Sequence, residues 1–187
     1  MTAIFPGSFD PVTLGHVDLI MRGTRLFGTV IVAVLHNPAK TPLLTLQERV
    51  CLLQKEVRDI PGVQVESYAG LLAEFASAKN AGYILRGVRS EADCAYEIPM
   101  AQANRKLSAG TEAGLKAKSE AKPETGLETI LLVADPAYGY ISSGMIREIA
   151  AAGYQNSTKQ NGFDDKALDQ WVSPAVKEVL KNKYTSS

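Results

Sequence analysis

The stretch FPGSFDPVTLGH, residues 5–16, connects the first apolar run of the chain to its first helix-like segment. Thr2 to Phe5 has the composition of a short buried strand, and Pro6-Gly7 is expected to end it. Apolar residues then recur at helical spacing from Val17 onward. The sequence therefore predicts a strand, a turn and a helix in succession, with this stretch at the corner between strand and helix.

Thr13 and His16 make this corner a candidate anion site. If Thr13 caps the helix, His16 lies in the first turn, where unpaired backbone N–H groups and the helix dipole favour an anion. An imidazole there can donate a further hydrogen bond to phosphate oxygens. The alternative is a structural histidine beside an ordinary turn, and this stretch alone leaves both interpretations open.

Apolar runs typical of strands alternate with helix-like segments along the chain. Thr45 and Glu48 form a capping box at the start of one such helix. The alternation predicts an α/β fold: a Rossmann-like parallel sheet with helices on both faces and ligands at the carboxyl ends of the strands. The strand-like runs are Ala3–Phe5, Val30–Leu35, Val63–Val65, Tyr83–Leu85 and Ile130–Val133.

Composition is that of a globular protein with one core. The 187 residues include 45% hydrophobic and 21% charged residues, which are ordinary values. Twenty basic and twenty acidic residues leave no net charge that would favour nucleic acid. No signal-like or membrane-spanning segment follows Met1, and Cys51 and Cys94 lack metal-ligand spacing. We therefore expect a cytoplasmic protein with reduced thiols and neither a membrane nor a nucleic-acid partner.

Two polar stretches interrupt the alternation. Residues 108–126 are small or charged apart from Leu115, and we expect them to form a flexible surface insertion. Residues 154–165 are expected to form a loop before a final amphipathic helix near residues 173–183. Because the sequence has no internal repeat and no sharp change of composition, it predicts a single domain over residues 1–187.

A lysine follows the second predicted strand. Pro38 is expected to end strand pairing there, and Lys40 then projects from a loop at the same edge of the sheet as His16. A lysine at that edge can contact phosphate. Taken singly, a loop lysine is more often a solvated surface charge, and the position at this edge of the sheet is what favours a role for Lys40.

Two arginines follow the fourth predicted strand. Gly87 separates Arg86 from Arg89, and a tight turn at this glycine would let both guanidinium groups reach phosphates. The alternative is that the two arginines form surface ion pairs with Glu91 or Asp93.

A second helix start follows the fifth predicted strand. Ser142 or Ser143 can cap the helix that contains Ile146, which would make another anion site at a helix N-terminus. Capping serines are common structural devices, so this motif is weak by itself. Together, however, the four motifs follow the first, second, fourth and fifth strands, which a parallel sheet brings to one edge.

The ordered set of motifs resembles that of bacterial phosphopantetheine adenylyltransferases, within the nucleotidyltransferase superfamily. The resemblance implies a Rossmann-like fold, usually assembled as a homohexamer. It also implies transfer of AMP from Mg-ATP to 4′-phosphopantetheine, giving dephospho-coenzyme A and pyrophosphate, the penultimate step of coenzyme A biosynthesis. The matching segments are Gly7–Pro11, Thr13–His16, Asn37–Lys40, Arg86–Arg89, Tyr96-Glu97 and Ile141–Ser143.

The resemblance implies roles for individual residues. His16, Lys40 and Arg89 would be catalytic, and Mg²⁺ would arrive with the nucleotide. The positions that match binding sites for 4′-phosphopantetheine are Ser8, Lys40, Leu72 and Arg86. The positions that match ATP-binding sites are Ser8, Phe9, His16, Gly87, Val88, Arg89, Glu97, Tyr138, Gly139, Tyr140, Ile141, Ser142, Ser143 and Gly144.

The sequence departs from the family pattern at several places. Gly144 stands where a third serine is more usual, and Cys94-Ala95 replaces a Phe-Glu pair. Pro99 lies in an expected helix interior, where a proline removes a hydrogen bond and can kink the helix that carries Glu97. Both polar stretches exceed the usual length of the family, which leaves the oligomer contacts near them open.

Two other functions fit part of the pattern. One is an adenylyl- or cytidylyltransferase acting on nicotinamide mononucleotide or glycerol 3-phosphate; Lys40 with the two arginines favours the pantetheine acceptor instead. The other is a non-catalytic nucleotide-binding regulator, which Cys94, Ala95 and Gly144 favour and His16 opposes. A dinucleotide dehydrogenase would need a GxGxxG motif that is absent.

In-line attack on phosphorus needs no covalent nucleophile, in agreement with the absence of sequence motifs for a covalent nucleophile.

Overall fold

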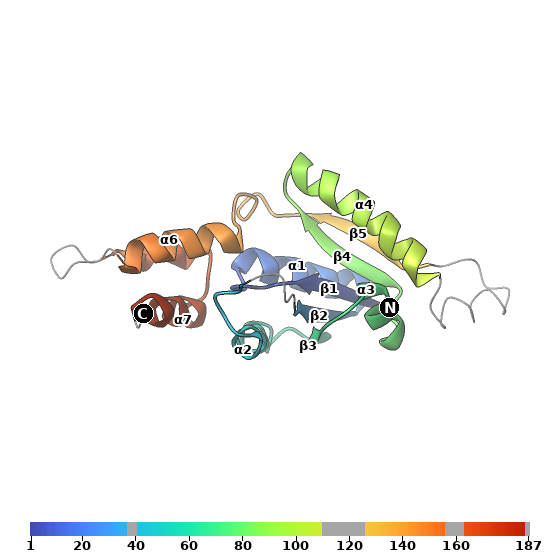
Figure 1. Cartoon of the computed structure of the whole chain (residues 1–187), viewed down its shortest axis with the longest axis horizontal. Helices are drawn as coiled ribbons and strands as arrows, with labels where there is room; N and C mark the ends of the chain where they lie inside the picture. The colour runs from blue at the N-terminus through green and yellow to red at the C-terminus, as the bar shows by residue number, and fades with distance from the viewer. Residues whose placement is uncertain (37–40, 110–125, 156–162, 186–187) are drawn as a thin grey trace.

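The computed structural model describes residues 1–36, 41–109, 126–155 and 163–185 (Figure 1). Its centre is a five-stranded sheet in the order β3-β2-β1-β4-β5, and every neighbouring pair is parallel. The predicted α/β fold is therefore confirmed. The strands are β1 (Thr2–Gly7), β2 (Thr29–Leu35), β3 (Val63–Tyr68), β4 (Tyr83–Val88) and β5 (Glu128–Val133).

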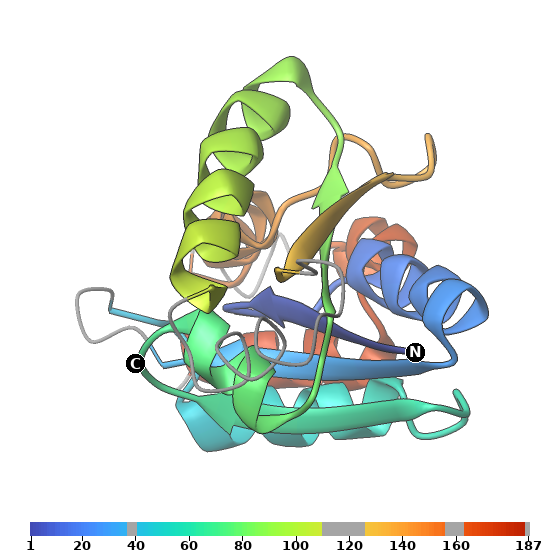
Figure 2. The same ribbon diagram turned by 90° about the vertical axis from the view of Figure 1, so that its right-hand side faces the viewer.

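Helices cover both faces of this sheet (Figures 1 and 2). One face carries α1 (Leu14–Phe27), α2 (Leu46–Glu56), α6 (Ser143–Gln155), the 3-10 helix η1 (Asp165–Gln170) and α7 (Pro174–Thr185). The opposite face carries α3 (Leu72–Ala78) and α4 (Glu91–Ser108), which contact each other. Alternate side chains of the buried strands point into the two resulting cores, as Phe5 and Ile4 of β1 do.

The direction of strand succession reverses between β1 and β4. β1 pairs with β2 from Thr2 to Gly7, but it pairs with β4 only at Ala3 and Ile4. The two strands therefore separate beyond Ile4. Because ligands of parallel α/β sheets bind at such a reversal, outside the carboxyl ends of the strands, this opening is the expected place for a site.

Two strands extend further than the sequence predicted. β1 does not end at Pro6-Gly7 but continues through both residues. In a strand the N–H and the carbonyl of one residue point to the same side, and the carbonyl of Pro6 points toward β4, where it accepts from Arg86. Because the β1–β4 ladder has already ended at Ile4, the missing N–H of Pro6 costs no ladder hydrogen bond. β4 likewise continues to Val88 because it pairs with β5 up to Val133. Residues 86–88 are therefore strand residues and not a loop.

Helix starts were predicted correctly. Two helices continue through positions where the sequence suggested a kink, at Pro99, or a loop, from Tyr154 onward. Thr45 caps α2 and forms the expected capping box with Glu48. α4 continues through Pro99. α6 extends to Gln155 because Tyr154 is buried, packs its ring 5.1 Å from Phe163 and donates its hydroxyl to a carboxylate of η1. The start of the predicted 154–165 loop is therefore helical.

Other features predicted from composition can be compared with the described residues. Most of the predicted insertion, residues 110–125, and residues 156–162 lie outside them. The final helix, α7, occupies the end of the chain where an amphipathic segment was expected. Cys51 and Cys94 are both half-buried and free. None of the helices in the described ranges has the length and apolar character needed to cross a bilayer.

Candidate functional site

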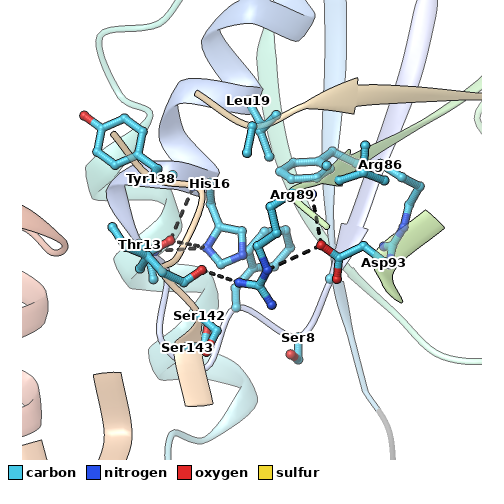
Figure 3. A pocket seen from close by; sticks show the side chains of 18 of the residues that line it. Ser8, Thr13, His16, Leu19, Arg86, Arg89, Asp93, Tyr138, Ser142 and Ser143 are labelled. Carbon is cyan, nitrogen blue, oxygen red and sulfur yellow. Dashed lines mark hydrogen bonds and ion pairs between the residues drawn. The ribbon is translucent and has the colours of Figure 1, made fainter. Parts of the chain in front are cut away.

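Two adjoining cavities lie where β1 and β4 separate. The first, here called the His16 cavity, has a volume of about 320 Å³ and lies between residues 5–16, the end of β4 and the start of α6 (Figure 3). The second, the Leu72 cavity, has a volume of about 520 Å³ and lies between the end of β2, the start of α3 and α4. Both cavities are lined by the same set of residues at their boundary, which we call the common wall: Pro6, Gly7, Ser8, Arg86 and Glu97.

His16 is held at the start of α1 by its own helix cap. Thr13 is the N-cap residue, as predicted, and its backbone N–H donates to His16 Nδ1 at 3.0 Å. Nδ1 is thus an acceptor, so the neutral ring carries its proton on Nε2. Within the described part of the chain, Nε2 has no hydrogen-bond partner. The structural and the anion-binding interpretations of His16 are therefore compatible, because each uses a different ring nitrogen.

The surroundings of His16 keep its ring uncharged. Burial, together with the positive charges of Arg89 and Arg86, lowers the pKa of His16 from 6.5 to about 4. Phe9 packs edge-on against the ring, with centroids 5.1 Å apart, and Phe5 lies 6.3 Å away. At neutral pH the imidazole is consequently a hydrogen-bond donor through Nε2, and the positive charge of the cavity comes from arginine.

Arg89 lies beside His16 and joins β4 to the loop before α6 (Figure 3). Its Nη1 donates to the carbonyl oxygen of Ile141, and its Nε lies 3.4 Å from the carboxylate of Asp93. This ion pair is one of the two alternatives that the sequence suggested. Nη2 of Arg89 has no partner among the described residues, so the guanidinium keeps one donor group for a ligand.

Each of the three nitrogens of Arg86 donates a hydrogen bond to a protein atom. Its Nε donates to Glu97 at 2.8 Å, its Nη2 donates to the other carboxylate oxygen of Glu97, and its Nη1 donates to the carbonyl of Pro6 at 2.6 Å. Arg86 therefore pairs with Glu97 rather than with Glu91. The sequence placed Arg86 with the acceptor and Glu97 with ATP; the structure brings both into the common wall, in contact with both cavities.

Gly87 is needed for a different reason from the one predicted. It lies inside β4 and not in a tight turn. A Cβ atom at this position would lie 2.3 Å from Cδ1 of Leu19, so any larger residue would force the buried side chain of Leu19 on α1 to shift. Gly87 thus positions the helix that carries His16.

The segment before α6 supplies a second helix start, as predicted. Ser142 caps α6: its Oγ accepts from the backbone N–H of Met145 at 3.1 Å. Ser143 donates its hydroxyl to the carbonyl of Pro11 at 2.8 Å, which joins this segment to the β1–α1 connection. A Cβ on Gly144 would lie 3.8 Å from Ser142 Oγ, so the more usual serine would fit there.

The predicted ATP-binding residues of this segment divide into two groups. Tyr138, Ile141, Ser142 and Ser143 line the His16 cavity, whereas Gly139, Tyr140 and Gly144 do not. The hydroxyl of Tyr140 instead accepts from Trp171 Nε1 at 3.2 Å, on the segment before α7. The remaining predicted ATP-binding residues that line this cavity are Ser8, Phe9, His16, Gly87, Val88, Arg89 and Glu97.

Three of the four predicted acceptor residues, Ser8, Leu72 and Arg86, line the second cavity. Leu72, the first residue of α3, lines it together with apolar side chains such as Tyr96 and Met100 of α4, and Ser8 belongs to the common wall. Lys40 lies outside the described residues. A mostly apolar cavity that meets polar residues at the common wall suits an organic chain that carries a phosphate.

Two buried charged residues next to the site were given no role by the sequence. Asp10 accepts the backbone N–H groups of Leu43 and Leu44, each at 2.9 Å, and pairs with Arg147 of α6 at 2.8 Å. Arg49 of α2 is also buried and bonds to backbone carbonyls. Asp10 was quoted only as part of a motif, because nothing in the local sequence indicates partners so far along the chain.

The charged groups of the His16 cavity suit a polyphosphate. The cavity combines a neutral imidazole donor, a free guanidinium donor and the starts of α1 and α6, all of which favour anions. Both carboxylates that line it, Asp93 and Glu97, are paired with arginine. Among the described residues no group of three or more His, Cys, Asp or Glu side chains could hold a metal ion.

Comparisons with known proteins find relatives that match most of this chain. Residues 4–149 match the family model described as Cytidylyltransferase-like. The phosphopantetheine adenylyltransferase of Caldanaerobacter subterraneus subsp. tengcongensis is 42% identical over 185 residues, which cover 99% of this chain and 98% of that protein. The protein of the same name from Syntrophotalea carbinolica is 37% identical over 182 residues, or 97% of this chain and 93% of its own.

A solved structure shows the same fold at low sequence identity. Plasmodium falciparum nicotinic acid mononucleotide adenylyltransferase, complexed with NaAD, superposes with a TM-score of 0.63 and 16% identity. The match covers 98% of this chain and 96% of that chain.

Proposed function

We propose that each of the two cavities binds one of the two substrates, from the premise that this chain belongs to the phosphopantetheine adenylyltransferase family. The enzyme transfers AMP from ATP to 4′-phosphopantetheine and forms dephospho-coenzyme A and pyrophosphate. The observation that carries the division is the common wall. Two substrates that lie on either side of one wall can bring the acceptor phosphate next to the α-phosphate of ATP.

ATP occupies the His16 cavity. Among the described residues, Nε2 of His16 and Nη2 of Arg89 are two side-chain donors that remain free there. The start of α6 adds the positive end of its helix dipole. The triphosphate lies against these donors, with the α-phosphate beside His16. Since the ring is neutral, its contribution is a directed hydrogen bond and not a charge.

The acceptor occupies the Leu72 cavity. The apolar residues around Leu72 contact the pantetheine arm, and Ser8 in the common wall meets the phosphate at its end. The family motif places Lys40 at the same phosphate. Each nitrogen of Arg86 already donates to a protein atom, which holds the guanidinium in place in the wall, while its charge and the second N–H of Nη1 and of Nη2 favour both phosphates.

The transfer is an in-line displacement at the α-phosphorus. A phosphate oxygen of the acceptor attacks, the bond to the bridging oxygen of the β-phosphate breaks, and pyrophosphate leaves with the electron pair. The protein's contribution is alignment and stabilisation of charge on the α-phosphate oxygens by His16, Arg89 and Lys40. One such donor is worth about 10²- to 10³-fold in rate. No covalent intermediate with the protein is needed.

Mg²⁺ enters with ATP. When bound, the ion neutralises charge on the triphosphate and so eases the departure of pyrophosphate. The two carboxylates of the cavity are each paired with an arginine, which fits an ion held mainly by phosphate oxygens and water. We expect pyrophosphate release to cease when EDTA removes Mg²⁺ and to return when the ion is added back.

One assay separates this function from its rivals. The protein is supplied with ATP or CTP and, in turn, 4′-phosphopantetheine, nicotinamide mononucleotide or glycerol 3-phosphate, and pyrophosphate release is measured. We expect release only with ATP and 4′-phosphopantetheine, with dephospho-coenzyme A as the other product. Release with another acceptor would contradict the assignment of the Leu72 cavity, and no release with any pair would favour a non-catalytic regulator.

The working assembly is a homohexamer in the cytoplasm. The family resemblance suggests the assembly, and apolar residues that line neither cavity support an interface: Ile98, Ile130 and Val133 are exposed on α4 and on the edge strand β5. The free thiols of Cys51 and Cys94 agree with a reducing compartment. Native mass spectrometry tests the assembly, with six copies expected and a monomer contradicting it. Cell fractionation tests the compartment.

A further inference from the structure

Arg49 occupies a position in α2 where an apolar side chain is expected. Leu46, Arg49, Val50 and Leu53 follow the i, i+3, i+4, i+7 spacing of a helix face that packs on a core. Arg49 is only 4% exposed. Burial of a guanidinium is unfavourable unless its contacts compensate for the lost hydration. We therefore expect the contacts of Arg49 to serve the fold or the site.

These contacts join the ends of two strands. Nη1 of Arg49 donates to the carbonyl oxygen of Ser8 at 2.7 Å and to that of Leu35 at 3.1 Å. Ser8 directly follows β1, and Leu35 is the last residue of β2. The ladder between these strands ends with Gly7 opposite Val34. Arg49 thus connects the two strands immediately beyond their last pair.

The connected residues lie at the acceptor side of the site. Ser8 and Leu35 both line the Leu72 cavity, and Ser8 also belongs to the common wall. Arg49 itself lines neither cavity. Its influence on a ligand therefore passes through the backbone of Ser8 and through the point where the chain leaves β2.

The charge of Arg49 is uncompensated. Among the described residues it forms no ion pair, and its buried Nε has no hydrogen-bond partner. A buried cation without a carboxylate partner favours an anion in its neighbourhood. The phosphate of a bound acceptor is such an anion.

We propose that Arg49 is a positioning residue for the acceptor. It fixes Ser8 and the exit of β2 around the acceptor phosphate, and its charge favours a phosphorylated acceptor over a neutral one. The proposal rests on the proposed function, since it takes the Leu72 cavity as the place of 4′-phosphopantetheine. Arg49 does not touch the reacting atoms, so its effect belongs in the acceptor KM more than in kcat.

Substitution by methionine tests this role. Arg49→Met keeps an unbranched side chain and removes the charge and both hydrogen bonds. Pyrophosphate release is measured with each substrate varied at a saturating level of the other. We expect the acceptor KM to rise about 10- to 100-fold, the range for lost charge-assisted hydrogen bonds, while the ATP KM changes less than about 3-fold. Arg58→Met is the matched control, because the side chain of Arg58 is 76% exposed, and we expect it to leave both values unchanged.

A second variant keeps the test decisive. Arg49→Lys retains the charge and one donor nitrogen, so we expect a rise in acceptor KM of about 3- to 10-fold, smaller than for Arg49→Met. Thermal unfolding shows whether each variant is folded. If Arg49→Met does not fold, Arg49→Lys decides alone.

Three results would overturn the proposal. In a folded variant, an unchanged acceptor KM or an equal rise in both KM values would mean that Arg49 only packs the core. Failure of both variants to fold would mean the same. If the parent protein releases no pyrophosphate with 4′-phosphopantetheine, the proposed function falls together with the inference, whereas an active parent with unaffected variants removes the inference alone.

Discussion

The two cavities meet at one wall but are built in different ways. The His16 cavity is made from short segments at strand ends and helix starts, and its free donors come from residues whose other atoms are fixed by nearby backbone groups. The Leu72 cavity is lined on one side by residues of α4 and on the other by strand ends and the start of α3, which lie far apart in the sequence. With the substrates placed as proposed, hydrogen bonds at strand ends and helix starts would position the reacting phosphates, while the packing of α4 against the strand ends would select the acceptor. Substitutions on the two sides should therefore change different kinetic parameters.

The largest expected effect is at His16. We expect His16→Ala to lower kcat about 10²- to 10³-fold with only a small change in the ATP KM. His16→Gln should lower kcat comparably but preserve stability, because a glutamine at this helix position can also accept the N–H of Thr13. Steady-state kinetics and thermal unfolding measure the two properties separately. A kcat equal to that of the parent in either variant would remove His16 from catalysis.

Glu97 tests the common wall, where one substitution should affect the binding of both substrates. Glu97→Ala leaves the guanidinium of Arg86 without its partner, and we expect a loss of about 3 kcal/mol in unfolding free energy. The KM values for both substrates should rise together. Asp59→Ala is the control, since its pair with Arg58 is exposed on both sides and should have no measurable effect. A change confined to one substrate would show that Glu97 serves only one cavity.

Gly87 tests whether packing behind His16 matters for the nucleotide side. Gly87→Ala brings a methyl group against Leu19, and we expect a loss of about 1–3 kcal/mol in urea-induced unfolding. The double variant Gly87→Ala with Leu19→Ala relieves the overlap and should be no less stable than Leu19→Ala alone. If Gly87→Ala were as stable as the parent, the close approach of α1 to β4 would not require glycine.

Leu72 tests the acceptor side with the smallest expected effect. Leu72→Ala removes apolar surface from the wall of its cavity, worth about 1 kcal/mol, so the acceptor KM should rise about 5-fold. The ATP KM and kcat should stay within about 2-fold of the parent. An effect on ATP alone would reverse the assignment of the two cavities.

The same contrast explains what the sequence could reveal. Thr13, His16 and Ser142 were identified because a helix cap depends on residues close together in the chain. The alternation of strands and helices was visible because apolar spacing is also local. The nucleotide side was therefore largely predictable.

Contacts between distant segments were not predictable in this way. The ladder between β4 and β5 carries Arg86 inside a strand, where it meets Glu97 across 11 positions of sequence. Asp10 reaches Leu43 and Arg147, 33 and 137 positions away. For Arg49 a signal did exist: a charged residue on the apolar face of an amphipathic helix either disrupts the face or has buried partners.

The central claim is that Nε2 of His16 donates a hydrogen bond to ATP from a neutral ring. The chain has two histidines, so in a His36→Gln variant labelled with ¹⁵N-histidine, NMR reports His16 alone. We predict a ring protonated on Nε2 that stays neutral from pH 8 to pH 5, in line with a pKa of about 4. ATP should shift the Nε2–H resonance and raise the pKa, because the bound phosphates favour the imidazolium. A ring that titrates near 6.5, carries its proton on Nδ1 or does not respond to ATP would contradict the account.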